Sequence, residues 1–126
     1  MEKEENLILE LINQRVSQLK WVDSYVYKFE SNSLTIVGSQ DFCYYHNFEI
    51  SFKDVHFYSG VFSWKWDYDD AKVFIEIIDD LTSKVQINQK FRVEQGNTLF
   101  KLNNTDGLEI FIGCRSVAFS NELVKY

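Results

Sequence analysis

Apolar residues recur at helical spacing in the first part of the chain. Between residues 3 and 19 they fall on one side of a helix, at Leu7, Ile8, Leu11, Ile12, Val16 and Leu19. Glutamates, glutamines and an asparagine occupy mainly the other side, at Glu4, Glu5, Glu10, Asn13, Gln14 and Gln18. The pattern predicts an amphipathic helix that covers an apolar surface.

From Trp21 onward the hydrophobic period changes to two, which is typical of a β-strand. Tyr25, Tyr27 and Phe29 share one predicted face, opposite Val22, Ser24, Val26 and Lys28. Ser31–Asn32 can form a tight turn before a second strand over 34–37, so the two strands are expected to form a hairpin. The residues at 38–40 then turn the chain again.

The longest alternation lies between residues 41 and 53. Aromatic and apolar residues share one face with a histidine, at Phe42, Tyr44, His46, Phe48, Ile50 and Phe52. A strand of this length is unusual, so we expect a bend or bulge near His46–Asn47. A break at Lys53–Asp54 precedes a short strand expected over 55–58.

The second half of the chain has weaker patterns. Residues 61–70 lack a regular period and are predicted to form a long loop. Residues 71–78 fit either a helix or a strand, and their β-branched content favours a strand. A connection is expected over 79–84, turns over 95–97 and 103–107, and strands near 85–94, 98–102, 108–113 and 115–119.

These elements predict a mainly β chain, α+β by count. About seven to nine antiparallel strands would form a sandwich or a partly open barrel behind one N-terminal helix. The 126 residues fit a single domain, 1–126, and the aromatic fraction of 17% favours strands.

The charge balance restricts the partners. The net charge of -6 disfavours nucleic acid and favours a basic or cationic protein partner.

No apolar run is long enough to span a membrane, and the acidic start of the chain does not fit a signal peptide, so a cytoplasmic location without a membrane partner is expected. No cofactor is implied. Strand edges without proline leave a homodimer open.

A few residues carry side chains suited to metal or cysteine chemistry. Cys43 and Cys114 have no CxxC spacing and lie in apolar runs, so both are predicted to be buried thiols. His46 and His56, with Cys43 and Glu49, offer donor atoms for zinc. Strict alternation, however, separates His46 from Cys43 and Glu49. We therefore expect a hydrogen-bonded histidine and no metal site, with a metal- or cysteine-dependent enzyme as an alternative.

The segment 61–70 combines aromatic residues with acids. Asp67 and Asp69 begin like a calcium loop, but the glycine and glutamate that such a loop needs are missing. Aromatic anchors beside carboxylates suit an interface with a cationic protein, although the tryptophans also fit one end of the core. The candidate partner-binding residues are Phe62, Trp64, Trp66, Asp67, Tyr68, Asp69 and Asp70. No catalytic residue is identified.

A family resemblance adds to these observations. The run YHNFEISFKDV over 45–55, followed by Trp64 and by IFIGCRSV over 110–117, resembles small, largely uncharacterised bacterial proteins. Some of these are grouped with immunity proteins of polymorphic toxin systems. The resemblance covers about half of the chain and implies a stoichiometric inhibitor that binds a toxin domain in the cytoplasm. It implies no catalytic residues.

The sequence thus favours a non-enzymatic, cytoplasmic protein-binding module, immunity-like and directed at a basic partner. One alternative is a carrier of a small hydrophobic ligand, held in a barrel lined by Phe42, Tyr44, Phe48 and Phe52. The other is an enzyme centred on His46, His56 and Cys43.

Overall fold

The computed structural model describes residues 2–78 and 97–126. It confirms the predicted fold class, because antiparallel strands dominate and a single helix precedes them. The described elements are α1 (Glu2–Leu19), β1 (Trp21–Glu30), β2 (Ser33–Ser39), β3 (Tyr45–His46), β4 (Phe48–Lys53), β5 (Phe57–Ser59), β6 (Ser63–Asp67), β7 (Ile75–Ile77), β8 (Thr98–Leu102), β9 (Phe111–Cys114), β10 (Ser116–Ser120) and β11 (Val124–Lys125).

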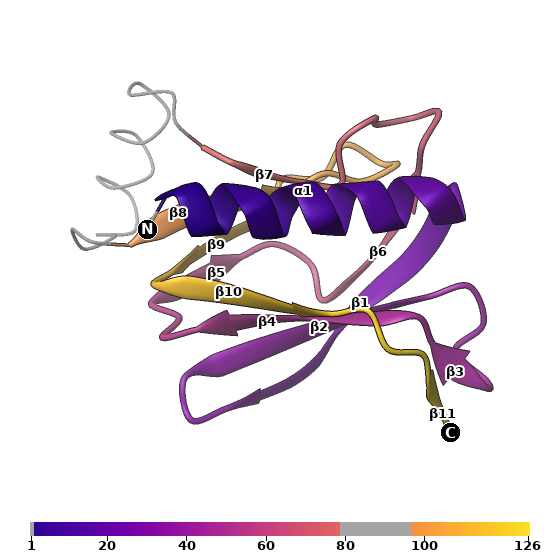
Figure 1. Cartoon of the computed structure of the whole chain (residues 1–126), viewed down its shortest axis with the longest axis horizontal. Coiled ribbons are helices and arrows are strands. Elements are labelled where there is room, and N and C mark those ends of the chain that lie inside the picture. The colour runs from indigo at the N-terminus through magenta and orange to yellow at the C-terminus, as the bar shows by residue number, and fades with distance from the viewer. Residues whose placement is uncertain (1, 79–96) are drawn as a thin grey trace.

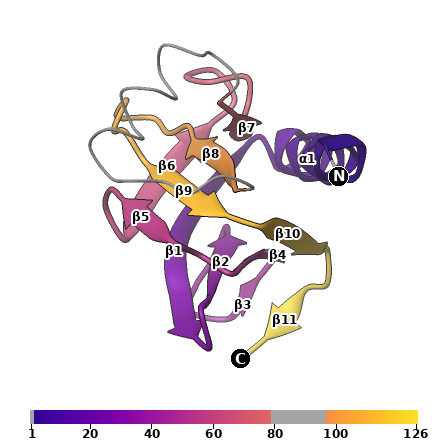
Figure 2. The ribbon, with the colours of Figure 1, turned by 90° about the vertical axis from the view of Figure 1, so that its left-hand side faces the viewer.

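The strands form two main sheets and a small ribbon. The five-stranded sheet has the order β10-β4-β2-β1-β6, and the four-stranded sheet has the order β5-β9-β8-β7. Strand β11 pairs only with β3 among the described residues. Helix α1 and the four-stranded sheet lie on the same side of the five-stranded sheet (Figure 1, Figure 2). None of the three described sheets closes into a barrel.

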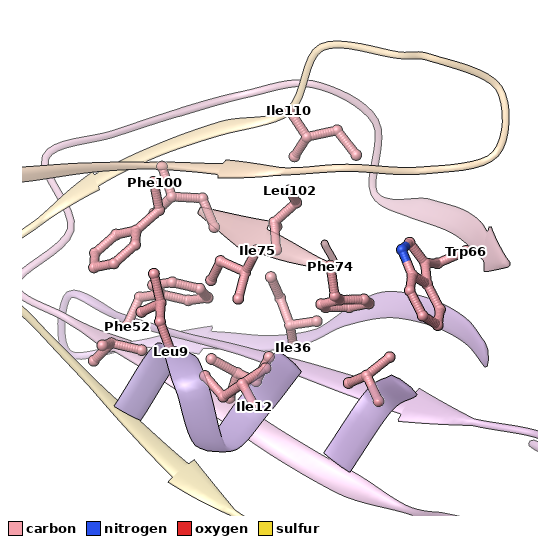
Figure 3. Packing of buried hydrophobic residues seen from close by; sticks show 14 of the residues in the cluster. Leu9, Ile12, Ile36, Phe52, Trp66, Phe74, Ile75, Phe100, Leu102 and Ile110 are labelled. Atoms are coloured by element: carbon pink, nitrogen blue, oxygen red, sulfur yellow. The ribbon is translucent and has the colours of Figure 1, made fainter. Parts of the chain in front are cut away.

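One hydrophobic core joins α1 to both main sheets. Ile12 and Val16 of α1 are fully buried, and Leu9 is nearly so. Phe52 of the five-stranded sheet meets Phe100 of the four-stranded sheet with ring centroids 5.6 Å apart (Figure 3). The apolar stripe of the helix is narrower than predicted, because Leu7 and Leu11 are exposed.

Strand β1 carries an irregularity that the sequence pattern did not indicate. Its register against β2 shifts between Val26 and Lys28. Tyr25 therefore pairs with Val37, whereas Phe29 pairs with Leu34, which belongs to the core face. The prediction that Tyr25 and Phe29 share a face is wrong, because an extra residue in a strand reverses the faces that follow it.

The bend predicted near residues 46 and 47 is confirmed. Asn47 separates β3 from β4 and is buried. Its N–H donates to the carbonyl of Gly38 (2.7 Å), and its side-chain oxygen accepts from the N–H of Gln40 (3.1 Å). The residues before the bend leave the predicted apolar face, since Tyr44 is exposed and Phe42 is only half-buried.

The loop predicted over residues 61–70 is wrong, because residues 63–67 form strand β6 and pair with β1. Trp64 and Trp66 alternate with Lys65, so the period of two was present but short. The strand preference within 71–78 is confirmed by β7, and the strand predicted over 98–102 is confirmed by β8. The connection predicted at 79–84 and the strand predicted at 85–94 lie outside the described residues.

The C-terminal strands also shift from their predicted bounds. Strand β9 begins at Phe111 and not near residue 108, and β11 was not predicted. With several strands of two or three residues, the described part of the chain has eleven strands, more than the sequence pattern indicated. No described helix has the length and apolar character needed to cross a membrane.

Candidate functional site

The two tryptophans proposed as partner-binding residues belong to the core. Trp64 is 4% exposed and Trp66 is 1% exposed. The Trp66 ring meets Phe74 edge-on at 5.8 Å and closes one end of the core (Figure 3). Of the aromatic candidates in 61–70, Phe62 is the one on the surface, with 70% of its area exposed.

The acidic candidates form a turn after β6. The carboxylate of Asp67 accepts a hydrogen bond from the N–H of Asp69 (2.9 Å), and the carbonyl of Asp67 accepts one from Asp70 (3.0 Å). Lys72 lies 3.9 Å from the Asp69 carboxylate and 4.2 Å from the centroid of the Tyr68 ring. The contacts of these residues are therefore mainly with one another. No group of metal ligands is found in the described part of the chain.

An apolar groove lies beside Phe62, and we call it the Phe62 groove. It has a volume of about 450 Å³ and is lined by Val26, Phe29, Leu34, Val55, His56, Phe57, Tyr58 and Phe62. The Phe62 ring stacks on Tyr58, with centroids 5.8 Å apart and planes 4° apart. Tyr58 is fixed in turn, because its hydroxyl donates to the carbonyl of Val61.

The bulge in β1 is what creates the Phe62 groove. It turns Phe29 to the core face of the five-stranded sheet, beside Leu34. Strand β5, which belongs to the other sheet, and the segment before it lie beside Phe29. They cover this side chain only in part and leave it 57% exposed. The N–H of Val55 donates to the carbonyl of Asn32 (2.9 Å), so this segment is tied to the β1–β2 turn. The groove therefore has fixed walls.

The second cluster that the sequence indicated is centred on His46. Its Nε2 lies 3.0 Å from Oε2 of Glu49, and its Nδ1 lies 2.9 Å from the hydroxyl of Tyr126. A neutral imidazole that donates from Nε2 and accepts at Nδ1 satisfies both bonds. The expected separation of His46 from Glu49 is wrong, because the break at Asn47 places them on the same side.

Tyr126, which follows β11, connects this cluster to the C-terminal strand. Partial burial of Tyr126, which is 57% exposed, raises its pKa to about 12, with smaller contributions from Tyr25, Tyr27 and Glu49. A phenol with this pKa stays protonated near neutral pH, whereas a nucleophilic tyrosine would need a lowered pKa. Tyr126 also donates its backbone N–H to Tyr44 (2.9 Å). The cluster thus holds β11 against β3.

His56 and Cys43, the remaining residues of the metal or cysteine alternative, are not among the residues that bond to the His46 ring. His56 lines the Phe62 groove, whereas His46 bonds to Glu49 and Tyr126. The prediction of two buried thiols is wrong for Cys43, which is exposed. Its backbone N–H donates to the Asp41 carboxylate (3.1 Å), which forms a turn. Cys114 is buried as predicted.

A further hollow lies where β1 and β6 pair, and we call it the Tyr25 hollow. Its volume is about 570 Å³, and its lining combines rings with charged groups: Asp23, Ser24, Tyr25, Phe42, Ser63, Trp64, Lys65 and Asp106. Sequence reasoning missed it, since its residues come from four separate segments. The available signal was the placement of Asp23 and Tyr25 two residues apart, on one face of β1.

No protein-family model matches the chain, and no curated protein or solved structure is significantly similar to it.

Proposed function

We propose that the chain is a non-enzymatic protein-binding module, and that its partner places an apolar side chain in the Phe62 groove. The observation that supports this best is the exposure of Phe29 and Phe62, at 57% and 70%, on two sides of one apolar groove. Rings held in place at low entropic cost are typical of interface hot spots. Contiguous apolar surface of this kind marks interaction sites more often than single exposed residues do.

The partner in this proposal is a basic protein in the cytoplasm. The chain carries a net charge of -6, which attracts a basic partner over long distances and speeds their encounter. A stoichiometric inhibitor of a basic toxin domain, the role that the immunity-protein resemblance implies, would bind in this way. The chain would then act by covering its partner and would need no catalytic group.

The lining of the groove also favours the second candidate, a carrier of a small hydrophobic ligand. Apolar sites of several hundred cubic ångströms accommodate such ligands. The ligand would lie in the Phe62 groove and not inside a barrel, because Phe48 and Phe52 are fully buried against other core rings. Mass spectrometry of the native protein would detect a hydrophobic molecule that co-purifies with it, and an alkane-like ligand lost on Phe29→Ser would favour the carrier.

Photocrosslinking tests the binding module. A benzoylphenylalanine at position 62 should crosslink to one basic protein, whereas the same group at position 7, which is also exposed, should not. With that protein purified, Phe62→Ser should weaken the measured dissociation constant by at least about tenfold, as expected for a hot spot. Leu7→Ser is the matched control and should leave affinity unchanged. Equal affinity for the wild type and Phe62→Ser would refute the proposal.

A further inference from the structure

We propose that the Tyr25 hollow binds a guanidinium group, as carried by an arginine side chain of a basic partner. The inference rests on the proposed function only for the source of the arginine. Three features support it: aromatic walls, two carboxylates and a fixed rim.

Two aromatic rings form the walls of the hollow. Tyr25 and Phe42 lie with centroids 4.6 Å apart and planes inclined by 65°, and both are half-buried. A cation is attracted to the face of an aromatic ring, and the planar guanidinium also stacks on it. Phe42 comes from the turn before β3, so tertiary folding brings the two rings together.

The charged groups of the hollow favour a cation. Asp23 and Asp106 supply two carboxylates, and Lys65 supplies one ammonium group. Lys65 is the direct cross-strand partner of Asp23. None of these three residues forms an ion pair with another described residue. The negative charge is therefore in excess and is available to a guanidinium, which can pair with carboxylates through two parallel hydrogen bonds.

The rim that carries Asp106 is held in place. The N–H of Thr105 donates to the carbonyl of Lys65 (2.7 Å), which ties the segment to β6. The buried side chain of Asn104 donates to the carbonyl of Leu108 (2.7 Å) and accepts from its N–H (2.9 Å). The turn that contains Asp106 is thus closed by its own hydrogen bonds. A fixed carboxylate costs less entropy when it binds a ligand.

Nuclear magnetic resonance at low ionic strength tests the site with three capped tripeptides. The probes are acetyl-Gly-Arg-Gly-amide, its lysine analogue and its citrulline analogue. We expect the arginine peptide to shift the amide signals of Asp23, Tyr25 and Asp106. The lysine peptide should bind at least about threefold more weakly, because it cannot stack or form bidentate pairs. The uncharged citrulline peptide should not bind. Equal binding of all three would overturn the proposal.

Matched variants separate the site from general charge attraction. Asp23→Asn combined with Asp106→Asn should weaken arginine binding by about tenfold, since both charge-assisted pairs are lost. Asp69→Asn combined with Asp70→Asn makes the same change of net charge on the exposed turn, and should change affinity by less than about twofold. Equal weakening by the two pairs would overturn the proposal, because it would show attraction without a site.

The variant Lys65→Gln tests whether the hollow prefers a positively or a negatively charged ligand. Removing this ammonium group should strengthen arginine binding, whereas weaker binding would contradict a cation site. Each variant is compared by its amide spectrum, so loss of the fold is recognised. The Phe62 groove is tested separately by photocrosslinking, so failure of the tripeptides to bind would leave the proposed function unaffected.

Discussion

The phenyl ring of Phe48 lies against the backbone of Gly38. A Cβ atom built on Gly38 would be 2.2 Å from Cζ of Phe48. The two residues are direct cross-strand partners in β2 and β4. Phe48 is fully buried, with Phe74 and Phe119 each at a centroid distance of 6.0 Å. The ring thus fills the space that a side chain at position 38 would need.

Gly38→Ala should therefore destabilise the protein by about 1–3 kcal/mol, the usual cost of overpacking a core. Urea denaturation followed by tryptophan fluorescence measures the change. Gly107→Asn is the control, because a Cβ there meets nothing within 4 Å and asparagine tolerates the positive φ of 67°. Equal midpoints for Gly38→Ala and the wild type would show that the ring moves aside freely.

Asn13→Asp should break the attachment of α1 to β7. Asn13 accepts from the N–H groups of Phe74 (2.9 Å) and Ile75 (3.0 Å) and donates to the carbonyl of Ile75 (2.9 Å). The aspartate carboxylate still accepts from the two N–H groups. It has no proton to donate to the carbonyl of Ile75, so that hydrogen bond is lost. We expect a loss of about 1–3 kcal/mol in the free energy of unfolding. Gln14→Glu, on the exposed side of the helix, should have little effect, and a similar loss in both variants would contradict this role.

Tyr126→Phe should loosen the C-terminal strand. It removes the hydroxyl that bonds to Nδ1 of the buried His46, whose other nitrogen remains bonded to Glu49. We expect a loss of about 1 kcal/mol and faster amide exchange in β11 than in β4. Tyr44→Phe, on an exposed ring, is the control. Unchanged exchange in β11 would show that backbone pairing alone holds the strand.

The two thiols should differ in reactivity. Cys43 is exposed and Cys114 is buried, so a thiol reagent such as Ellman's reagent should modify one cysteine rapidly in the folded protein. The second should react only after urea is added. Cys43→Ser should abolish the rapid phase. A rapid phase that persists in this variant would mean that Cys114 is accessible.

Stability should fall in alkaline solution above the ordinary pKa of tyrosine. Burial raises the pKa of Tyr58 from 10.0 to about 12, and the pKa of Tyr126 is raised similarly. Between these values the folded state keeps protons that the unfolded chain has released, so the free energy of unfolding decreases as the pH rises. Below the unfolded pKa this contribution is fully present.

Urea midpoints near pH 8 and pH 11 measure this dependence. Tyr58→Phe should reduce the difference between the two midpoints, because the residue that resists ionisation is gone. The same pH dependence in the wild type and Tyr58→Phe would contradict the raised pKa.

Local patterns in the sequence predicted most of the elements. Helical spacing gave α1, and alternation gave the β1–β2 hairpin and β4, because each of these periods follows from backbone geometry alone. The break near Asn47 was predicted from the length of the alternation. Strand β6 was missed, since its pattern covers only five residues and resembles an acidic loop.

The candidate site was predicted less well, because exposure depends on what packs against a residue. Trp64 and Phe62 differ by two positions, yet one is 4% exposed and the other 70%. A search for aromatic residues beside acids therefore selected two buried tryptophans together with the exposed Phe62. The groove and the hollow both depend on residues from distant segments, which no local pattern relates.

The sequence by itself determined the class of fold, the turn between β1 and β2 and the excess of negative charge, since these depend on residues close together in the chain or on composition. The tertiary structure alone decided which faces are covered. One register shift in β1 turns Phe29 toward the core face, and one break at Asn47 brings His46 to Glu49. Asn13, on the polar side of its helix, binds a strand 62 residues away. Such contacts depend on how distant segments pack, and packing decides which side chains remain free to bind.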